Sequence, residues 1–125
     1  MSQITKGFRV VTLLLDGTVN WVDLGFSAEI YPFLSQTVGG YIEAVPLETN
    51  CTMYINEEGK LRGLPINYVA NLLAHKLNSG LREYDYIVGN AVICGPLDGA
   101  GYDTSMTEQE YATIVAALNL KETAQ

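Results

Sequence analysis

The sequence contains few of the residues from which metal sites and disulfide frameworks are built. Its 125 residues include two cysteines and one histidine. Cys51 and Cys94 lie in apolar, strand-like runs, and no second cysteine or histidine stands near either of them at metal-ligand spacing. This pattern predicts two buried, reduced thiols, since a disulfide between them would be unusual in a cytoplasmic chain. We therefore expect no metal and no other cofactor.

Catalytic motifs are missing as well. No serine or cysteine stands in a nucleophile-elbow pattern, and the lone histidine, His75, falls in the middle of an expected helix. Acid–base chemistry would have to come from two carboxylates, for example Glu57 and Asp85, whose pairing depends on the tertiary fold. The sequence therefore predicts a protein that is not an enzyme, with a carboxylate-based enzyme as an alternative.

Long apolar runs and positive charge are also scarce. The longest apolar run, Val10–Leu15, is the size of a strand, whereas a membrane span needs roughly 18 to 20 residues. Met1–Lys6 has no basic region followed by an apolar stretch, so we expect no secretory signal, no membrane partner and a cytoplasmic location. Seven basic and fourteen acidic residues give a net charge of -7, which disfavours direct binding of nucleic acid.

What the sequence does contain is enough apolar material for one hydrophobic core. Hydrophobic residues make up 48% of the chain and charged residues 17%, as in folded globular proteins. A chain of 125 residues is too short for two independent cores. We predict a single domain, residues 1–125, with a core from about residue 8 to about residue 120 and loose ends.

Two strand pairs are expected in the first half of the chain. The β-branched and aromatic runs Phe8–Leu15 and Thr18–Leu24 flank Asp16-Gly17, which favours a two-residue turn with positive φ at both central positions. Tyr41–Leu47 and Cys51–Asn56 form a similar pair of runs, joined by three polar residues. Each pair predicts an antiparallel hairpin.

Three helices are expected between and after these strands. Ser27 is placed to cap the first helix, which ends at Gly39-Gly40. Pro65 suits the first turn of the second helix, which runs to about Leu77. The third helix follows the capping box Thr107-x-x-Glu110. In the second helix the expected core stripe consists of Val69, Leu72, Leu73 and Leu77.

The region before the third helix allows more than one interpretation. Tyr84–Val88 and Ala91–Cys94 flank Gly89-Asn90, which predicts either a tight hairpin or one strand with a bulge. Gly95–Asp103 is rich in glycine and reads as a loop, and its backbone could form an anion nest. The order is then ββα repeated three times, so we predict an α+β fold with a mostly antiparallel sheet and about three helices.

One candidate binding segment begins at the end of the fourth expected strand. Asn56 precedes Glu57-Glu58-Gly59, a turn in which Gly59 is expected to be left-handed. If the chain is extended after this turn, Lys60 and Arg62 point to the same face and can clamp a phosphate or a carboxylate. The alternative is ordinary turn chemistry with solvated charges.

A second candidate lies on the helix that follows. Asn67, Asn71, His75 and Asn78 repeat at helical spacing and form a stripe of uncharged hydrogen-bonding side chains. Such a stripe could bond to a base, a sugar or a second copy of the chain, and the alternative is an ordinary solvated face. If Asn67 binds a ligand, Asn67→Ala should abolish binding and leave folding intact.

Four spaced motifs give the chain a resemblance to a known family. They are Tyr41-Ile42-Glu43-Ala44-Val45, Asn56-Glu57-Glu58-Gly59-Lys60, Gly63-Leu64-Pro65-x-Asn67 and Asp85-x-Ile87-x-Gly89-x-Ala91. Together they resemble a small domain of unknown function found in bacteriophages and actinobacterial plasmids. The resemblance covers approximately residues 8 to 112 and implies an origin in a mobile element, with no established activity.

These observations lead to two functional hypotheses. The first is a phage-type, non-enzymatic counter-defence protein that sequesters a small anionic, nucleotide-like ligand near the Asn56–Asn67 segment, in a homo-oligomer. The alternative is a protein–protein inhibitor of a host factor, acting as an acidic DNA mimic or as a partner binder. The expected site residues are Asn56, Glu57, Glu58, Lys60, Arg62, Asn67, Asn71 and His75.

Overall fold

Five strands and three helices make up the described part of the chain, which in this computed structural model comprises residues 7–25, 30–77 and 85–118. The strands are β1 (Arg9–Leu13), β2 (Val19–Asp23), β3 (Ile42–Pro46), β4 (Cys51–Asn56) and β5 (Ala91–Pro96). The helices are α1 (Ile30–Val38), α2 (Tyr68–Lys76) and α3 (Glu108–Leu118). The two expected loose ends, Ser27, Asn78 and Tyr84 lie outside the described residues.

The strands form one sheet in the order β2-β1-β5-β4-β3, and every neighbouring pair is antiparallel. This confirms the predicted α+β class with an antiparallel sheet and three helices. The ββα order occurs twice, but the third unit contains the single strand β5, which pairs with both β1 and β4 in the middle of the sheet. The third repeat of the rough ββα order therefore has one strand in the described residues.

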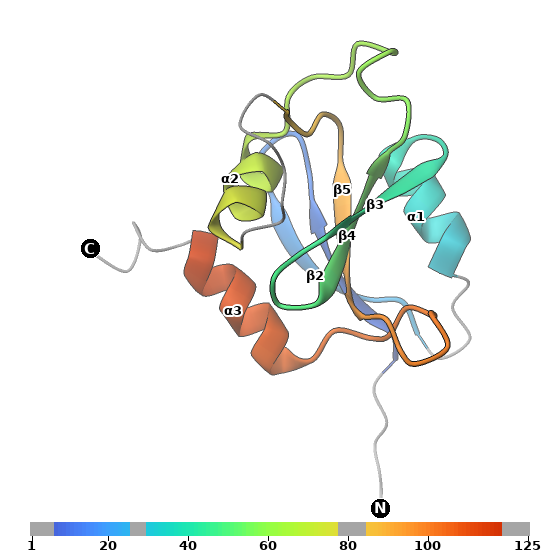
Figure 1. The fold of residues 1–125 in the computed structure, drawn as a ribbon, viewed down its shortest axis with the longest axis vertical. Coiled ribbons are helices and arrows are strands. Elements are labelled where there is room, and N and C mark those ends of the chain that lie inside the picture. The colour runs from blue at the N-terminus through green and yellow to red at the C-terminus, as the bar shows by residue number, and fades with distance from the viewer. Residues whose placement is uncertain (1–6, 26–29, 78–84, 119–125) are drawn as a thin grey trace, which may run out of the picture.

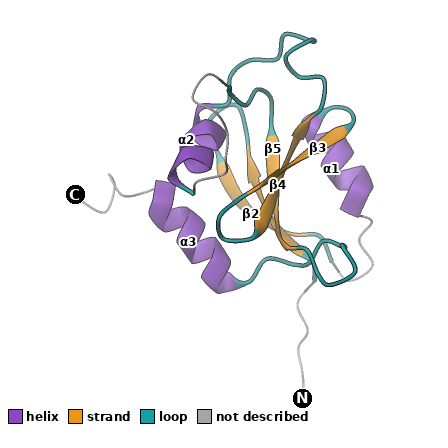
Figure 2. Ribbon diagram, viewed as in Figure 1, coloured by secondary structure: helices purple, strands orange, loops and turns teal. Residues whose placement is uncertain are grey.

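The helices cover both faces of this sheet. Figures 1 and 2 show α1 on one side and α2 with α3 on the other, with the strands between them. None of the helices in the described segments is long and apolar enough to cross a membrane. The arrangement is a three-layer sandwich in which both faces of the sheet need apolar side chains.

Each face has its own cluster of buried residues because side chains alternate along a strand. On β5, Ala91 and Ile93 join the larger cluster under α2 and α3, whereas Val92 and Cys94 join the smaller cluster under α1. The two thiols fall on opposite faces, since Cys51 belongs to the larger cluster. Both are buried and free, as predicted, and burial raises the pKa of each.

The first hairpin forms with a loop one residue longer than expected. The N–H of Leu14 donates to Thr18 O at 3.0 Å, and the N–H of Gly17 donates to Leu14 O at 2.9 Å. Gly17 has a φ of 92°, but Asp16 does not have positive φ. The loop is therefore a three-residue one closed by a left-handed glycine, and the expected two-residue turn was wrong. The second hairpin repeats this loop, with Asn50 left-handed at a φ of 71°.

Helix α2 begins later than Pro65. Its N-cap is Asn67, and the chain before it is extended beside residues 87–89. The N–H of Gly89 donates to Pro65 O at 2.8 Å, and the N–H of Asn67 donates to Ile87 O at 3.1 Å. This pairing keeps the backbone out of the helical region until Asn67. It also occupies the segment before β5, so neither the hairpin nor the bulged strand expected there forms.

The buried face of α2 differs from the expected stripe at one position. Leu73 and Leu77 are buried, but Leu72 is 44% exposed. Two small residues, Ala70 and Ala74, take the remaining buried positions, at 0% and 1% exposure. Ala70 and Ala74 belong to the larger core cluster, whereas the longer Leu72 side chain turns outward.

The loop after β5 is closed by its own side chains. The carboxylate of Asp98 accepts hydrogen bonds from the N–H groups of Ala100 and Tyr102, both at 2.9 Å. These N–H groups are the donors that an anion nest would need, so the loop does not offer that site. The predicted capping box of α3 is confirmed, because Thr107 and Glu110 exchange hydrogen bonds of 2.9 and 3.0 Å.

Candidate functional site

The segment after β4 is a series of tight turns instead of an extended strand. The N–H of Arg62 donates to Glu58 O, and the N–H of Gly63 donates to Lys60 O. Gly59 does not have positive φ, whereas Gly63 does, at 69°. Glycine is required at position 59 because a Cβ there would lie 2.7 Å from Cγ2 of Val88.

These turns separate the two cations that the sequence predicted to act together. The guanidinium of Arg62 donates to Gly39 O at 2.8 Å, at the end of α1. The ammonium of Lys60 instead binds the carboxylate of Asp85. The predicted clamp depended on an extended chain, in which alternate side chains share a face. It was wrong because the chain turns between the two residues.

Asn56 has a structural role in joining β4 to α1. Its side chain is buried, and its amide N–H donates to Val38 O at 3.0 Å. Its amide oxygen accepts from the N–H of Glu58 at 2.7 Å. The amide is therefore committed to the backbone on both sides. The side chain of Glu58 is exposed on the outside of the same turn.

Asn67 is the most buried polar residue of the predicted site, at 1% exposure. Its amide N–H groups donate to Leu13 O and Gly89 O, both at 2.9 Å. Its amide oxygen accepts from the N–H of Ala70 at 2.9 Å, which caps α2. The side chain therefore uses both amide N–H groups and the amide oxygen, and these hydrogen bonds connect β1, α2 and the segment before β5.

Asn71 and His75, the other described residues of the predicted stripe, do not share a face for binding either. The amide of Asn71 donates to Ile87 O at 2.8 Å and accepts from Ile87 N at 2.9 Å, like a short piece of paired strand. His75 is exposed at the other end of the helix. Asn67 and Asn71 therefore hold the fold together, and the stripe is not a shared binding face.

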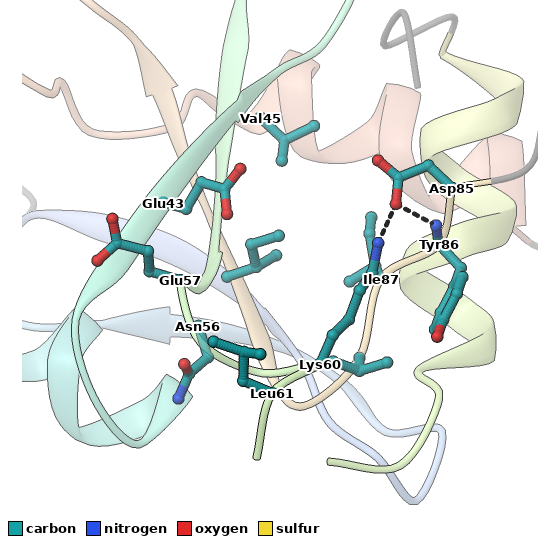
Figure 3. A pocket seen from close by; sticks show the side chains of 11 residues that line it. Glu43, Val45, Asn56, Glu57, Lys60, Leu61, Asp85, Tyr86 and Ile87 are labelled. Carbon is teal, nitrogen blue, oxygen red and sulfur yellow. Dashed lines mark hydrogen bonds and ion pairs between the residues drawn. The ribbon is translucent and has the colours of Figure 1, made fainter. Parts of the chain in front are cut away.

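A cleft nevertheless lies beside this segment (Figure 3). It occupies about 140 Å³ between the ends of β3 and β4 on one side and residues 85–88 on the other. Val45, Ile55 and Ile87 give it an apolar floor. Its other lining residues are Glu43, Asn56, Glu57, Lys60, Leu61, Asp85, Tyr86 and Val88. Of the eight predicted site residues, three line it: Asn56, Glu57 and Lys60.

The cleft carries more negative than positive charge. Glu43, Glu57 and Asp85 contribute three carboxylates, whereas Lys60 is the single cation among the lining residues. In Figure 3 the carboxylate of Glu43 points into the cleft, toward the wall that carries Asp85. Among the described residues, Glu43 and Glu57 have no side-chain hydrogen bond or ion pair. The Glu43 carboxylate is therefore available to a positive group that enters the cleft.

Lys60 already shows how a cation sits in this cleft. Its ammonium binds Asp85 and also lies over the ring of Tyr86, 4.5 Å from the ring centroid. A carboxylate and an aromatic face together stabilise an ammonium or a guanidinium group. This wall therefore shows the chemistry that stabilises a basic side chain, and Lys60 of the chain itself occupies it.

Two large apolar side chains that line the cleft are exposed. Leu61 is 90% exposed at the tip of the turn, and Tyr86 is 44% exposed on the opposite wall. Tyr68 and Leu72 of α2 are exposed as well. Exposed aromatic and aliphatic side chains next to a pocket are typical of surfaces that bind other proteins.

The sequence reasoning missed Glu43, although one signal pointed to it. Glu43 lies between Tyr41 and Val45 in the same alternation, and Val45 faces the core. Glu43 shares this face of the strand but is exposed, so its carboxylate lies where the core side of the sheet opens to solvent. Lys60 and Asp85, 25 residues apart in sequence, could be paired only by the fold.

The carboxylate pair considered for catalysis does not converge. Glu57 and Asp85 both line the cleft, but Figure 3 shows the Glu57 carboxylate turned away from it, and Asp85 is bound to Lys60. Within residues 7–25, 30–77 and 85–118, no group of three or more histidine, cysteine or acidic side chains could hold a metal ion. Glu57 and Asp85 are therefore not arranged as an acid–base pair in this structure.

Residues 21–119 match the model of a protein family described as a domain of unknown function, DUF3846. The chain belongs to this family. All four motifs that carried the resemblance fall inside the matched DUF3846 region. No match was found among curated proteins or among solved structures. Membership of DUF3846 assigns no activity.

Proposed function

We propose that this domain is a non-enzymatic partner-binding protein whose cleft takes a basic side chain of another protein. The observation that carries this proposal is the cleft itself, with its Glu43 carboxylate, which pairs with no cation in the described part of the chain, its acidic and aromatic wall and its volume of about 140 Å³. Pockets for whole small molecules are commonly about 300 to 1,000 Å³. The cleft therefore suits one lysine or arginine side chain of a larger partner.

The competing proposal is sequestration of a small anionic, nucleotide-like ligand by a homo-oligomer. It has weaker support, because three carboxylates line the cleft and its single cation is already bound to Asp85. A phosphate brought to this wall would meet repulsion from Glu43 and would have to displace an ion pair. Native mass spectrometry of protein taken from producing cells would report both copy number and any bound small molecule.

The mobile-element origin that the family resemblance implies would give the partner a biological setting. On this proposal the protein acts in the cytoplasm of a host cell, where a small acidic phage protein inhibits a basic surface of a host factor. Acidic mimicry of DNA would act through the same kind of basic surface. The chain's net charge of -7 supports attraction to such a partner.

The proposal can be tested by capture from host lysate with matched variants. Glu43→Lys should remove the captured partner, because it places a cation where a basic side chain is expected. Glu48→Lys is the control, since it makes the same charge change at an exposed position outside the cleft. Equal capture by both variants would rule out the cleft. Calorimetry with cyclic nucleotides and ADP-ribose tests the competing proposal, which a ligand in either class would support.

A further inference from the structure

Strand β3 is the outer strand on its side of the described sheet. The hydrogen bonds at its two ends establish which of its backbone groups are bonded to β4. The N–H of Glu57 donates to Tyr41 O, and the N–H of Leu47 donates to Cys51 O, both at 2.9 Å. In an antiparallel pair such bonded positions alternate with unbonded ones, so Tyr41, Glu43, Val45 and Leu47 direct their backbone groups to β4.

The even-numbered residues of β3 therefore direct their backbone groups outward. Ile42 and Ala44 each present an N–H and a C=O along this edge, and Pro46 presents a C=O. No further strand lies beyond β3 in the part of the chain that the structure describes. An unpaired row of this kind is a template for a strand from another protein.

Side chains of β3 reach a cavity on each face of the sheet. Glu43 and Val45 line the acidic cleft on the α2 and α3 side. Ile42 points to the α1 side, where it lines a second cavity of about 260 Å³. The other residues of this second cavity are Ile30, Tyr31, Leu34, Tyr102 and Asp103.

The second cavity has the same chemical character as the first. Tyr31 and Tyr102 are 51% and 72% exposed, and the carboxylate of Asp103 is fixed by a 2.6 Å hydrogen bond from the Tyr54 hydroxyl. Among the described residues, no cation pairs with Asp103. Aromatic rings beside an uncompensated carboxylate favour a cationic side chain.

We propose that the partner binds by adding a strand to the outer edge of β3, with basic side chains that enter the cavities on both faces. This inference rests on the proposed function, because it uses the same cleft. Side chains of an added strand alternate between the two faces of the sheet, so the backbone supplies affinity and the two cavities supply specificity. A second copy of this chain is disfavoured, since pairing two β3 edges would bring two acidic clefts together.

The experiment begins with selection of random peptides of about ten residues against the wild-type protein. Selected peptides should carry two lysine or arginine residues an odd number of positions apart, so that their side chains point to opposite faces of the sheet. In the complex, hydrogen exchange at the amides of Ile42 and Ala44 should slow by at least about tenfold, because these N–H groups become bonded. This measurement needs no variant. Unchanged exchange at both amides would overturn the inference.

Ala44→Pro provides an independent test. Proline removes the outward N–H of residue 44, and an edge strand tolerates proline where the N–H faces solvent. Affinity for the selected peptides should fall by at least about tenfold, while Ala44→Ser, which keeps the N–H, should bind as wild type does. Circular dichroism checks that both variants fold. Equal affinity of a folded Ala44→Pro variant would overturn strand addition.

Glu43→Gln separates this inference from the proposed function. Peptides that lose affinity with Glu43→Gln and keep it with Ala44→Pro would leave the cleft as the site and refute strand addition. Peptides that respond to Ala44→Pro alone would support the edge and refute the cleft. Loss with both variants is the expected result. Failure to select any peptide that responds to either variant would overturn both.

Discussion

At the scale of single residues, the amides near the cleft are structural groups that resemble ligand-binding groups. An asparagine can replace two backbone partners at once, which makes it suitable where a chain turns between elements. Asn56 and Asn71 each bond to backbone groups of a neighbouring element, and Asn67 does so for two elements. Their residue type suggested a binding site, but burial and bonding give them a different role.

Replacement of Asn67 should therefore destabilise the protein. Asn67→Ala removes the cap of α2 and leaves Leu13 O and Gly89 O buried without these donors, which should cost about 2 to 4 kcal/mol. Urea unfolding measures the loss. The exposed His75 is the control, since His75→Ala should change stability by no more than about 0.5 kcal/mol. Equal stability of both variants would contradict the structural role.

The buried thiol of Cys94 should make stability depend on alkaline pH. Burial, together with the charge of Asp103, raises the pKa of Cys94 above its ordinary value of 9.0. The folded protein then holds this proton more tightly than the unfolded chain, so the free energy of unfolding is complete below about pH 9 and falls as pH rises further. Tyr54, with a raised pKa, acts in the same direction from its ordinary value of 10.0.

Chemical denaturation at several alkaline pH values measures this effect. Cys94→Ala should show a shallower decline in the free energy of unfolding above about pH 9 than the wild type, because one titrating group is gone. The slopes of the free energy of unfolding against pH are compared, because the substitution also changes packing and so shifts the absolute values. Parallel curves for the two proteins would show that Cys94 does not contribute.

At the scale of elements, the sequence predicted the helical periodicity of α2 correctly but not every residue on its buried face. The expected stripe identified Leu73 and Leu77 correctly, yet Leu72 lies outside the core. Ala70 and Ala74 take the buried positions instead and belong to the larger core cluster. The predicted stripe was chosen from the large apolar residues of the helix, so it did not include these alanines.

The adjacent leucines of α2 give a direct test of this rotation. Leu73→Ala should cost about 2 to 5 kcal/mol, because it leaves a cavity at a position with 0% exposure. Leu72→Ala should cost less than about 1 kcal/mol, since that side chain is 44% exposed. Thermal or urea unfolding of the pair measures both effects. A similar cost for the two would mean that the helix in solution is rotated from its orientation in this structure.

At the scale of the whole molecule, charge should govern association. The chain has a net charge of -7, and both cavities beside β3 contain carboxylates. Affinity for a basic peptide selected on this protein should therefore fall as salt rises from about 50 to 500 mM, mainly through a slower association rate. Surface plasmon resonance measures the rates. Affinity that does not change with salt would mean that apolar contacts dominate.

Much of the fold could be predicted, because its signals are local. The second hairpin, the end of α1 at Gly39 and the capping box of α3 depend on residues a few positions apart. The site could be predicted only in part. Glu57 and Lys60 were placed near it, but Glu43 was missed, and Arg62 lies elsewhere because the turn after β4 directs it toward α1.

The sequence by itself determined the α+β class, the antiparallel pairing, the free thiols and the acidic character, since each of these follows from composition or from short-range alternation. Only the tertiary structure decided that β5 lies in the centre of the sheet, that Asn67 is buried and that Lys60 meets Asp85. These features depend on residues that are far apart in the chain, and local periodicity carries no information about which distant segments meet.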